Sequence, residues 1–430
     1  MIRQTRNIFS FLIIVIFCSA ILYQFINLSE DMIMGDFAAK KLLVSPRCGF
    51  MRIFENVVTI RNQSVNRLAA DFAQVFFPAQ NITSLDEAYN PAQTSDPWHR
   101  PSCYPPFVHY ICFFMFGRFP YGYASFFHML IQTILFFCGF RVAFSTLGLR
   151  YWFFPMVLFA SFALFLTPVG LSWFERGQFS LYVALSHLWL LLGLILNKKI
   201  YIGFSAICAF IKWTSFPFVF VIFAVYFMLC RDKRELKYFF EMGTIFLLTI
   251  AALFLFNLQA GIHFVERISF QEWNFAPDGI SLTRLLPRPL IKFLPLLFIL
   301  CGFLRSKINL SFEGEPVMKD LRYRLVYFIP FFSAIGILFI TYPTFAYDYS
   351  VPNLLGLIPF LIYWAKLTKL NGLYQRLVLF LFFFFIVTAS FFFEIYPSDL
   401  AVLIFYLCIS GAIFSLDFLG SLHLSRKKEA

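Results

Sequence analysis

Charged side chains that could do chemistry are few in this chain, and they fall at the ends or at breaks of long apolar runs. The carboxylate Asp36 follows the first apolar run, and the turn 175–178 (Glu-Arg-Gly-Gln) precedes a later one. Lys212 interrupts the apolar residues 201–230. A positioned carboxylate can take a proton from an attacking hydroxyl, and cations can stabilise a departing anion. These residue types indicate acid–base and anion-binding chemistry, provided that the fold brings them together.

The overall composition indicates a membrane protein. Apolar residues make up 60% of the 430 residues and charged residues 13%, and Phe alone occurs 64 times. A soluble globular protein is excluded by these values. The net charge of +12 does not indicate nucleic-acid binding. The Lys and Arg residues lie in short clusters between apolar runs, where membrane topology explains them.

The apolar runs set the expected transmembrane helices. The first, Ile8–Ile26, follows Arg3 and Arg6 and lacks a small-residue cleavage site, so it predicts an uncleaved helix rather than a signal peptide. Residues 106–117 are too short to span and predict a re-entrant or interfacial helix. Nine further runs are expected to span: 121–144, 152–169, 179–197, 238–257, 288–304, 325–341, 350–366, 376–394 and 400–420.

Charge distribution decides the fold of residues 201–230. A hairpin of two short helices that breaks at Lys212 keeps most Lys and Arg residues on the side of both termini, whereas a single crossing inverts that bias. The sequence therefore predicts an all-α polytopic membrane protein forming a single integral domain, residues 1–430. It would have about ten full transmembrane helices, a broken hairpin and a re-entrant helix, with both termini cytoplasmic.

Polar residues are expected to meet at the extracytoplasmic face. The large first loop, 28–105, would lie there with the turn 172–178, the second outer loop 258–288 and the turn 342–349. Candidates for binding donor phosphate or substrate are Lys212, Arg176, Gln178, Glu175, Arg100, Tyr104, Asp348 and Arg288. The mixture of charged and aromatic side chains suits a ligand with an anionic head, a hydroxyl-rich body and an apolar tail. Polyprenyl-phosphate sugars combine all three.

Glycosyl transfer from such a lipid needs no nucleotide, because the activated sugar is already in the membrane. The chain contains no P-loop, GxGxxG, HExxH or GxSxG motif and no Cys/His spacing typical of zinc sites. We therefore expect no cofactor. Cys48 and Cys103 lie in the large first loop and could form a disulfide in an oxidising compartment, while the other seven cysteines lie in or beside apolar runs.

Five short motifs, in this order and spacing, resemble a known family. They are Gly35-Asp36-Phe37, Tyr104-Pro105-Pro106, Glu175-Arg176-Gly177-Gln178, Ala209-Phe210-Ile211-Lys212 with Pro217, and Tyr347-Asp348-Tyr349 with Asn353-Leu354-Leu355. The chain resembles the GT-C class of polytopic glycosyltransferases, and within it the bacterial DUF2029 (GT87) family of polyprenyl-phosphate-mannose-type transferases.

The resemblance implies specific roles. An acidic residue in the first outer loop of such enzymes acts as base, and by position this is Asp36. The Gly-Gln turn of the family corresponds to Gly177 and Gln178, and its re-entrant lysine to Lys212. The chain departs from the family pattern at 37–40 (Phe-Ala-Ala-Lys), where a tyrosine is common, and its first loop is longer.

Simpler interpretations exist for each candidate. Asp36 could cap a helix, Lys212 could extend to the interface, and Arg288 could anchor at lipid headgroups. Glu175 and Arg176 could pair with each other, and Gln178 could cap the next helix. Tyr104 could be structural, since the prolines after it start a helix.

The sequence leads to one principal hypothesis and two rivals. The first is a glycosyltransferase in the bacterial inner membrane, active at the extracytoplasmic face, whose partners are membrane lipids, a polyprenyl-phosphate sugar and a glycolipid or glycan acceptor. A transporter or flippase of lipid-linked sugars would equally use a broken helix with a buried charge. A polysaccharide polymerase or ligase would share the lipid donor but transfer whole repeat units.

Overall fold

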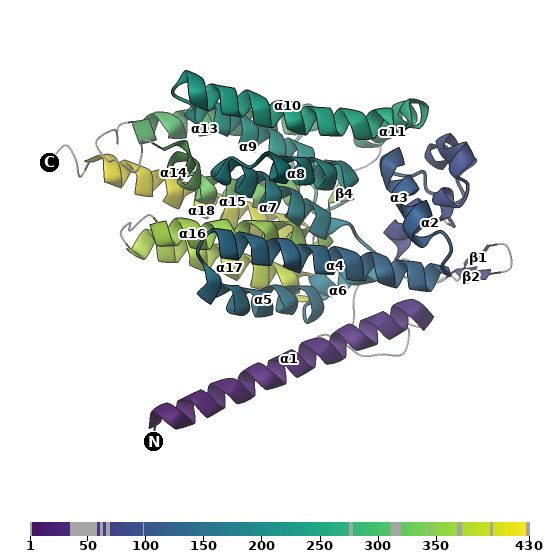
Figure 1. The fold of residues 1–430 in the computed structure, drawn as a ribbon, viewed down its shortest axis with the longest axis horizontal. Helices are drawn as coiled ribbons and strands as arrows, with labels where there is room; N and C mark the ends of the chain where they lie inside the picture. The colour runs from purple at the N-terminus through teal and green to yellow at the C-terminus, as the bar shows by residue number, and fades with distance from the viewer. Residues whose placement is uncertain are drawn as a thin grey trace.

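A computed structural model gives the fold, which is predominantly helical (Figure 1). It describes residues 2–34, 58–60, 63–65, 69–97, 99–274, 278–310, 320–343, 345–346, 348–367, 372–395 and 399–426. Asp36 and Cys48 lie outside the described residues.

The first part of the chain contains α1 (Ile2–Met34), β1 (Val58–Ile60), β2 (Gln63–Val65), α2 (Ala70–Ala79), η2 (Ile82–Tyr89), α3 (Pro106–Phe116), α4 (Tyr121–Thr146), α5 (Arg150–Phe165) and α6 (Pro168–Glu175). The middle contains α7 (Ser180–Leu196), α8 (Lys199–Ile211), η3 (Trp213–Ser215), α9 (Phe216–Leu229), α10 (Lys233–Leu255), α11 (Leu258–Asn274), β3 (Asp278–Gly279), η4 (Leu282–Arg284), α12 (Arg288–Lys292) and α13 (Leu294–Leu310). The last part contains α14 (Leu321–Val326), α15 (Ile329–Ile340), β4 (Phe345–Ala346), η6 (Asp348–Leu357), α16 (Ile358–Leu367), α17 (Gly372–Ile395) and α18 (Asp399–Arg426).

Several helices have the length and composition of membrane spans. Among the described residues four qualify singly: Tyr121–Thr146, Lys233–Leu255, Ser350–Leu367 and Leu400–Leu419. The number rises to as many as six if α5 with α6, and α8 with α9, each count as one bent span. Five shorter apolar helices accompany them. The structure therefore has the character of a helical membrane protein, while the count of about ten spans stays a prediction.

The first helix is longer than the apolar run that predicts it. It continues to Met34, eight residues beyond Ile26. Leu28 and Met32 on this extension are 1% and 3% exposed, so the extra turns are stabilised by packing rather than by lipid.

The residues 199–229 form two helices that meet at a bend of 117°. Lys212 at the end of α8 leaves the helical region with φ −128° and ψ 87°, and a single 3₁₀ turn follows. Pro217 lies in the first turn of α9, where its missing N–H costs no hydrogen bond. Lys212 is thus the residue at which the direction of the chain changes.

The elements between α1 and α4 gather at one end of the bundle. Figure 1 shows α2 and α3 at the right, whereas the Ile2 end of α1 and the Arg426 end of α18 lie at the left. α7 lies within the bundle and packs against α4, α8 and η6. The contact with η6 is close, because a Cβ on Gly356 would come 2.0 Å from the carbonyl oxygen of Ala184.

The described residues contain four short strands, which form two pairs. β1 and β2 are antiparallel, and β3 and β4 are parallel. The second pairing joins residues 278–279 to 345–346, and nearby the Leu282 N–H donates to the Thr341 carbonyl at 2.8 Å. The loop after α11 and the loop after α15 are therefore held together.

Candidate functional site

Asp71, in the first turn of α2, is a carboxylate around which several polar side chains gather. It is 6% exposed. Arg176 donates to both of its oxygens, from Nε at 2.9 Å and from Nη2 at 3.2 Å. Gln178 Nε2 also donates to Oδ2, and Arg100 Nη1 lies 3.7 Å from Oδ1. Residues from two other segments, Arg100 and the turn 176–178, therefore converge on this carboxylate.

Backbone contacts hold α2 against the 176–178 turn. The Asp71 N–H donates to the Arg176 carbonyl at 2.9 Å. The apolar face of α2 is buried, with Phe72, Val75 and Ala79 at 1% exposure or less, so hydrophobic packing fixes the helix that carries the carboxylate. Arg100 is anchored by Asp96, from Nε at 3.0 Å and from Nη2 at 2.9 Å, and it also donates to the Ala70 carbonyl.

Gly177 explains why this turn can approach α2 so closely. Its φ is +62°, in the left-handed region that favours glycine. A Cβ there would come 2.8 Å from Ala69 Cβ and 3.0 Å from Ala69 Cα. The glycine thus allows Arg176 and Gln178, on either side of it, to reach the same carboxylate.

Lys212 lies next to this group without a carboxylate of its own. Its Nζ donates to the Tyr104 hydroxyl at 3.3 Å and to Gln178 Oε1 at 3.5 Å, and it lies 4.8 Å from the centre of the Tyr104 ring. The side chain is half-buried. Within the described residues no carboxylate oxygen lies within 4.0 Å of this ammonium. Its hydrogen-bond partners in the described part of the chain are neutral oxygen acceptors, and the Asp71 carboxylate acts on its charge from beyond hydrogen-bond distance.

The electrostatics of the group favour an ionised Asp71 with excess positive charge around it. Burial raises the pKa of the Asp71 carboxyl, whereas the charges of three nearby cations, Arg176 first, lower it by more, and the net shift is downward. Arg100, Arg176 and Lys212 face the carboxylates of Asp71 and Asp96. Because the oxygens of Asp71 are engaged by donors, this carboxylate orients cations rather than accepting a proton.

Cys103 connects the hairpin break to α11. The indole N–H of Trp213 donates to the Cys103 carbonyl at 3.2 Å, and the thiol lies 2.9 Å from Gln271 Oε1. Burial raises the pKa of the Cys103 thiol, so it stays protonated at neutral pH. The predicted disulfide stays a prediction, because Cys48 is outside the described residues.

Five of the sequence-predicted residues meet here: Arg100, Tyr104, Arg176, Gln178 and Lys212. Arg176 pairs with Asp71 across 105 residues of chain, and the Gln178 side chain bonds Asp71 and does not cap α7. Glu175 ends α6 and Asp348 begins η6, but the structure describes the side chain of neither. Arg288 begins α12, whose Lys292 pairs with Glu272 at 2.6 Å.

Asp71 was not among the residues that the sequence singled out. No motif marks it. The available signal was local: an apolar stretch with helical spacing, 70–79, inside an otherwise polar loop, with one acid in its first turn. Such a helix has to bury its apolar face, and the acid on it then needs a buried partner.

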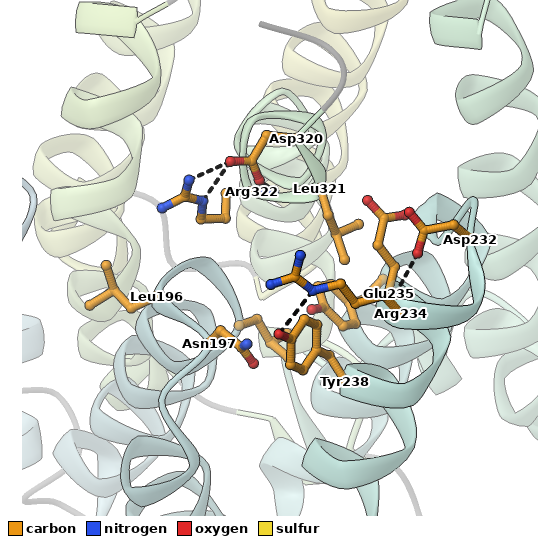
Figure 2. Close-up of a pocket in the computed structure, with 11 residues that line it drawn as sticks. Leu196, Asn197, Asp232, Arg234, Glu235, Tyr238, Asp320, Leu321 and Arg322 are labelled. Atoms are coloured by element: carbon orange, nitrogen blue, oxygen red, sulfur yellow. Dashed lines mark hydrogen bonds and ion pairs between the residues drawn. The ribbon is translucent and has the colours of Figure 1, made fainter.

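A second polar region lies at the opposite end of the bundle (Figures 1 and 2). A cavity of about 450 Å³ opens between the end of α7, the start of α10 and α14. In Figure 2 the Asp320 carboxylate accepts from Arg322, and Arg234 Nε donates to the Tyr238 hydroxyl at 3.2 Å. Arg324 pairs with Glu235 at 2.5 Å beside it. Of these three pairs, Arg324–Glu235 joins α14 to α10, whereas Asp320 with Arg322 and Arg234 with Tyr238 each lie within one segment.

Within the described part of the chain, no group of three or more His, Cys, Asp or Glu residues could hold a metal ion. Scans of the chain against models of protein families, against curated proteins and against solved structures found no match.

Proposed function

We propose that this protein is a GT-C-type glycosyltransferase, which moves a sugar from a polyprenyl-phosphate donor to a lipid or glycan acceptor. The observation that carries the proposal is the ammonium of Lys212 at a break between two apolar helices, where its direct partners among the described residues are neutral oxygens. An ionisable residue inside an interrupted apolar element is costly and is retained for function. An anionic ligand that neutralises it, such as the phosphate of the donor, recovers that cost.

The residues around Lys212 have different roles in binding this phosphate. Gln178 bridges the two charges, since its Nε2 donates to Asp71 and its Oε1 accepts from Lys212. Asp71 fixes the guanidinium of Arg176 through two hydrogen bonds and is therefore a positioning residue. A preorganised set of cations stabilises charge on a departing group without reorganising during the reaction.

The reaction then proceeds by a single displacement. The acceptor hydroxyl oxygen bonds to the anomeric carbon while the bond from that carbon to the phosphate oxygen breaks. The electron pair leaves with the polyprenyl phosphate, which Lys212 holds. The acceptor proton passes to a carboxylate, which by the resemblance is Asp36, in the same outer segment as Asp71.

The proposal includes a bacterial inner-membrane location with about ten spans, cytoplasmic termini and an extracytoplasmic site. Two features support this orientation. The Ile2 end of α1 and the Arg426 end of α18 lie opposite α2 and α3 (Figure 1). Basic residues gather at that same end, including Lys198, Lys199, Lys233, Arg234 and Arg322, as the positive-inside rule requires.

A transfer assay tests the function directly. Purified protein in nanodiscs is incubated with radiolabelled polyprenyl-phosphate mannose or glucose and with membrane glycolipids, and labelled products are separated. Lys212→Met is expected to lower the transfer rate about 10²-fold, as loss of a charge-stabilising donor does in other enzymes. Lys212→Arg should keep part of the rate. Lys199→Met is the matched control, because Lys199 begins the same helix at its other end, exposed and paired with Glu241.

Equal rates for Lys212→Met and the wild type would contradict the role of the ammonium. Equal rates for Asp36→Asn and the wild type would contradict the assigned base and leave the phosphate site intact.

The bend of 117° at Lys212 also favours a second candidate, a transporter of lipid-linked sugars. Movement of labelled donor across liposomes without a covalent product would support that candidate. A polymerase or ligase is distinguished by product size, because it adds whole repeat units instead of one sugar.

A further inference from the structure

We propose that a cavity on the far side of α2 binds the sugar of a lipid-anchored acceptor, so that the acceptor class is a glycolipid rather than a soluble glycan. This inference rests on the proposed function and adds a second subsite to it. The cavity lies between α2, η2 and the turn that joins α3 to α4, and its volume is about 800 Å³. Small-molecule sites in proteins have volumes of roughly 300 to 1,000 Å³.

The polar lining of the cavity matches a hydroxyl-rich ligand. Besides Arg118, it consists of amides, hydroxyls and one carboxylate: Gln80, Asn81, Ser84, Glu87, Gln93 and Ser95. Amides and hydroxyls can each donate and accept, as sugar hydroxyls do, and a single carboxylate can accept from two neighbouring hydroxyls. The lining therefore offers alternating hydrogen-bond partners and little net charge.

Aromatic rings form another part of the same wall. They come from Phe76, Phe77, Phe119 and Tyr121. The Tyr121 ring lies 5.1 Å from the ring of Phe77 and 5.4 Å from that of Phe76, so these three make one continuous surface. The apolar C–H face of a pyranose packs on such a surface while its hydroxyls bond the polar side. A wall of rings facing amides distinguishes a saccharide from a simple anion as the occupant.

The rim of the cavity indicates that the sugar is attached to a lipid. Arg118 and Phe119 follow α3, an apolar helix of 11 residues. Phe114 on this helix is 76% exposed and Phe119 is 44% exposed, and neither belongs to the protein core. Exposed aromatic rings beside a basic residue are typical of the membrane interface, where the ring contacts acyl chains and the cation contacts headgroup phosphate. The lipid of the acceptor would thus lie along α3 and the sugar in the cavity.

The cavity shares its inner wall with the Asp71 group. Ser95 lines it, and the next residue, Asp96, holds Arg100 against Asp71. Tyr121 lines it as well, and its hydroxyl donates to the Ala69 carbonyl at 2.7 Å, directly before α2. A saccharide bound in the cavity is separated from the phosphate-holding group by α2, so the hydroxyl that attacks the donor must belong to a part of the acceptor that extends beyond the cavity.

Binding of alkyl glycosides tests the inference without any transfer reaction. The protein in nanodiscs is titrated with four probes: the dodecyl glycosides of mannose, glucose, galactose and N-acetylglucosamine. Partition into empty nanodiscs is subtracted. We expect saturable binding of at least one dodecyl glycoside, at least tenfold weaker binding of its methyl glycoside, and no saturable binding of dodecyl phosphate.

Two tryptophan substitutions assign that binding to the cavity. Ser84→Trp fills the cavity and is expected to weaken binding at least tenfold. Thr83→Trp is the matched control, because Thr83 is the exposed neighbour and does not line the cavity. Arg118→Met should weaken binding severalfold, with Arg141→Met on α4 as its control. Thermal unfolding of each variant verifies that it is folded.

The results separate this inference from the proposed function. Saturable binding that is lost in Ser84→Trp and retained in Lys212→Met supports the cavity even if no transfer is found. Failure of all four dodecyl glycosides to bind, or equal binding by Ser84→Trp and Thr83→Trp, overturns the inference even if transfer to another acceptor is active. Equal affinity for methyl and dodecyl glycosides overturns the assignment of a lipid-anchored acceptor.

Discussion

Two buried arginine–carboxylate groups in this protein have similar hydrogen bonds but different surroundings. Arg305 on α13 reaches Asp417 on α18 from Nε at 2.8 Å and from Nη2 at 3.1 Å. Arg176 reaches Asp71 by the same two atoms at 2.9 and 3.2 Å. Arg305 and Asp417 are 2% and 8% exposed, and the guanidinium lies 5.1 Å from the ring of Phe328. Arg176, by contrast, shares its carboxylate with other donors and has the ammonium of Lys212 nearby.

From this difference we infer that the Arg305–Asp417 pair is structural, whereas the Asp71 group can bind a ligand. Arg305 and Asp417 neutralise each other beside an aromatic ring, and the guanidinium also donates to the Tyr327 carbonyl, so the effect of this pair is to fix α13 against α18. Among the described residues around Asp71, three cations (Arg100, Arg176 and Lys212) face two carboxylates (Asp71 and Asp96), and Lys212 is half-buried. Positive charge remains there for an anion. The substitutions that follow test this contrast.

The largest loss of stability is expected when the buried pair of Arg305 and Asp417 is broken. Asp417→Ala leaves the Arg305 guanidinium buried and uncompensated, which typically costs about 3–5 kcal/mol. The free energy of unfolding, measured in detergent by denaturant titration, should fall by that amount. The double variant Arg305→Met with Asp417→Leu should recover most of the loss, since an apolar pair of similar volume replaces the charges. A double variant as unstable as Asp417→Ala would contradict the interpretation as a simple joint.

A smaller loss of stability but a larger loss of function is expected at Asp71. Asp71→Asn keeps the shape of the side chain and removes the charge that orients Arg176. The expected loss is about 1–3 kcal/mol, because a hydrogen-bonded charge is replaced by a neutral acceptor. Transfer should fall at least tenfold, whereas Asp417→Asn should leave the transfer rate per folded molecule unchanged. Equal transfer by both variants would remove the distinction between the two groups.

Acid should selectively reduce the contribution of the Asp71 carboxylate to stability. The folded pKa of Asp71 lies below its ordinary value, so its contribution to stability is complete above the unfolded pKa of about 3.9 and is lost as pH falls through the lower folded pKa. Wild-type protein should therefore lose thermal stability below about pH 4 by a margin that Asp71→Asn does not show. Parallel unfolding curves of both proteins from pH 7 to pH 3 measure this margin. Identical slopes would contradict the downward shift.

The smallest change in the free energy of unfolding is expected for substitutions at the cavity of Figure 2. Asp320 and Arg322 are paired but largely exposed to solvent. Exposed pairs contribute about 0.2–1 kcal/mol, so Asp320→Asn should change the free energy of unfolding by no more than this. The change should shrink further in 0.5 M salt, as solvent-screened pairs do. A loss comparable to that of Asp417→Ala would show that this region is also a sealed joint.

The sequence predicted several residues of the candidate site but not Asp71, the carboxylate at its centre. The 175–178 turn and Lys212 stand out because charged residues interrupt apolar runs there, and such interruptions in a membrane protein need a reason. Asp71 did not stand out because one acid in a polar loop is ordinary. Only the docking of α2, driven by its buried apolar face, makes that acid exceptional.

The helical membrane class followed from composition, but the limits of individual helices did not. α1 extends to Met34 because Leu28 and Met32 pack against the bundle, which hydropathy alone does not reveal. The apolar run expected at 152–169 corresponds to α5, whereas part of the turn expected at 172–178 is helical in α6, which begins at Pro168 and is bent by 72° from α5. Tertiary contacts and prolines set these boundaries, whereas the number of spans predicted from hydropathy depends on how each bent pair is counted.

The separation of Asp71 from Arg176 in the chain has a consequence for biosynthesis. α2 leaves the ribosome before α3 to α6, and the partners at 176–178 follow about a hundred residues later. Until the Gly177 turn is in place, Asp71 lacks the two hydrogen bonds from Arg176, although Arg100 has already been synthesised. While α3 to α6 are being inserted, the segment that carries α2 therefore lacks the contacts that the 176–178 turn makes in the folded protein. A ribosome stalled before residue 176 should leave it open to protease, and one stalled after α7 should leave it protected.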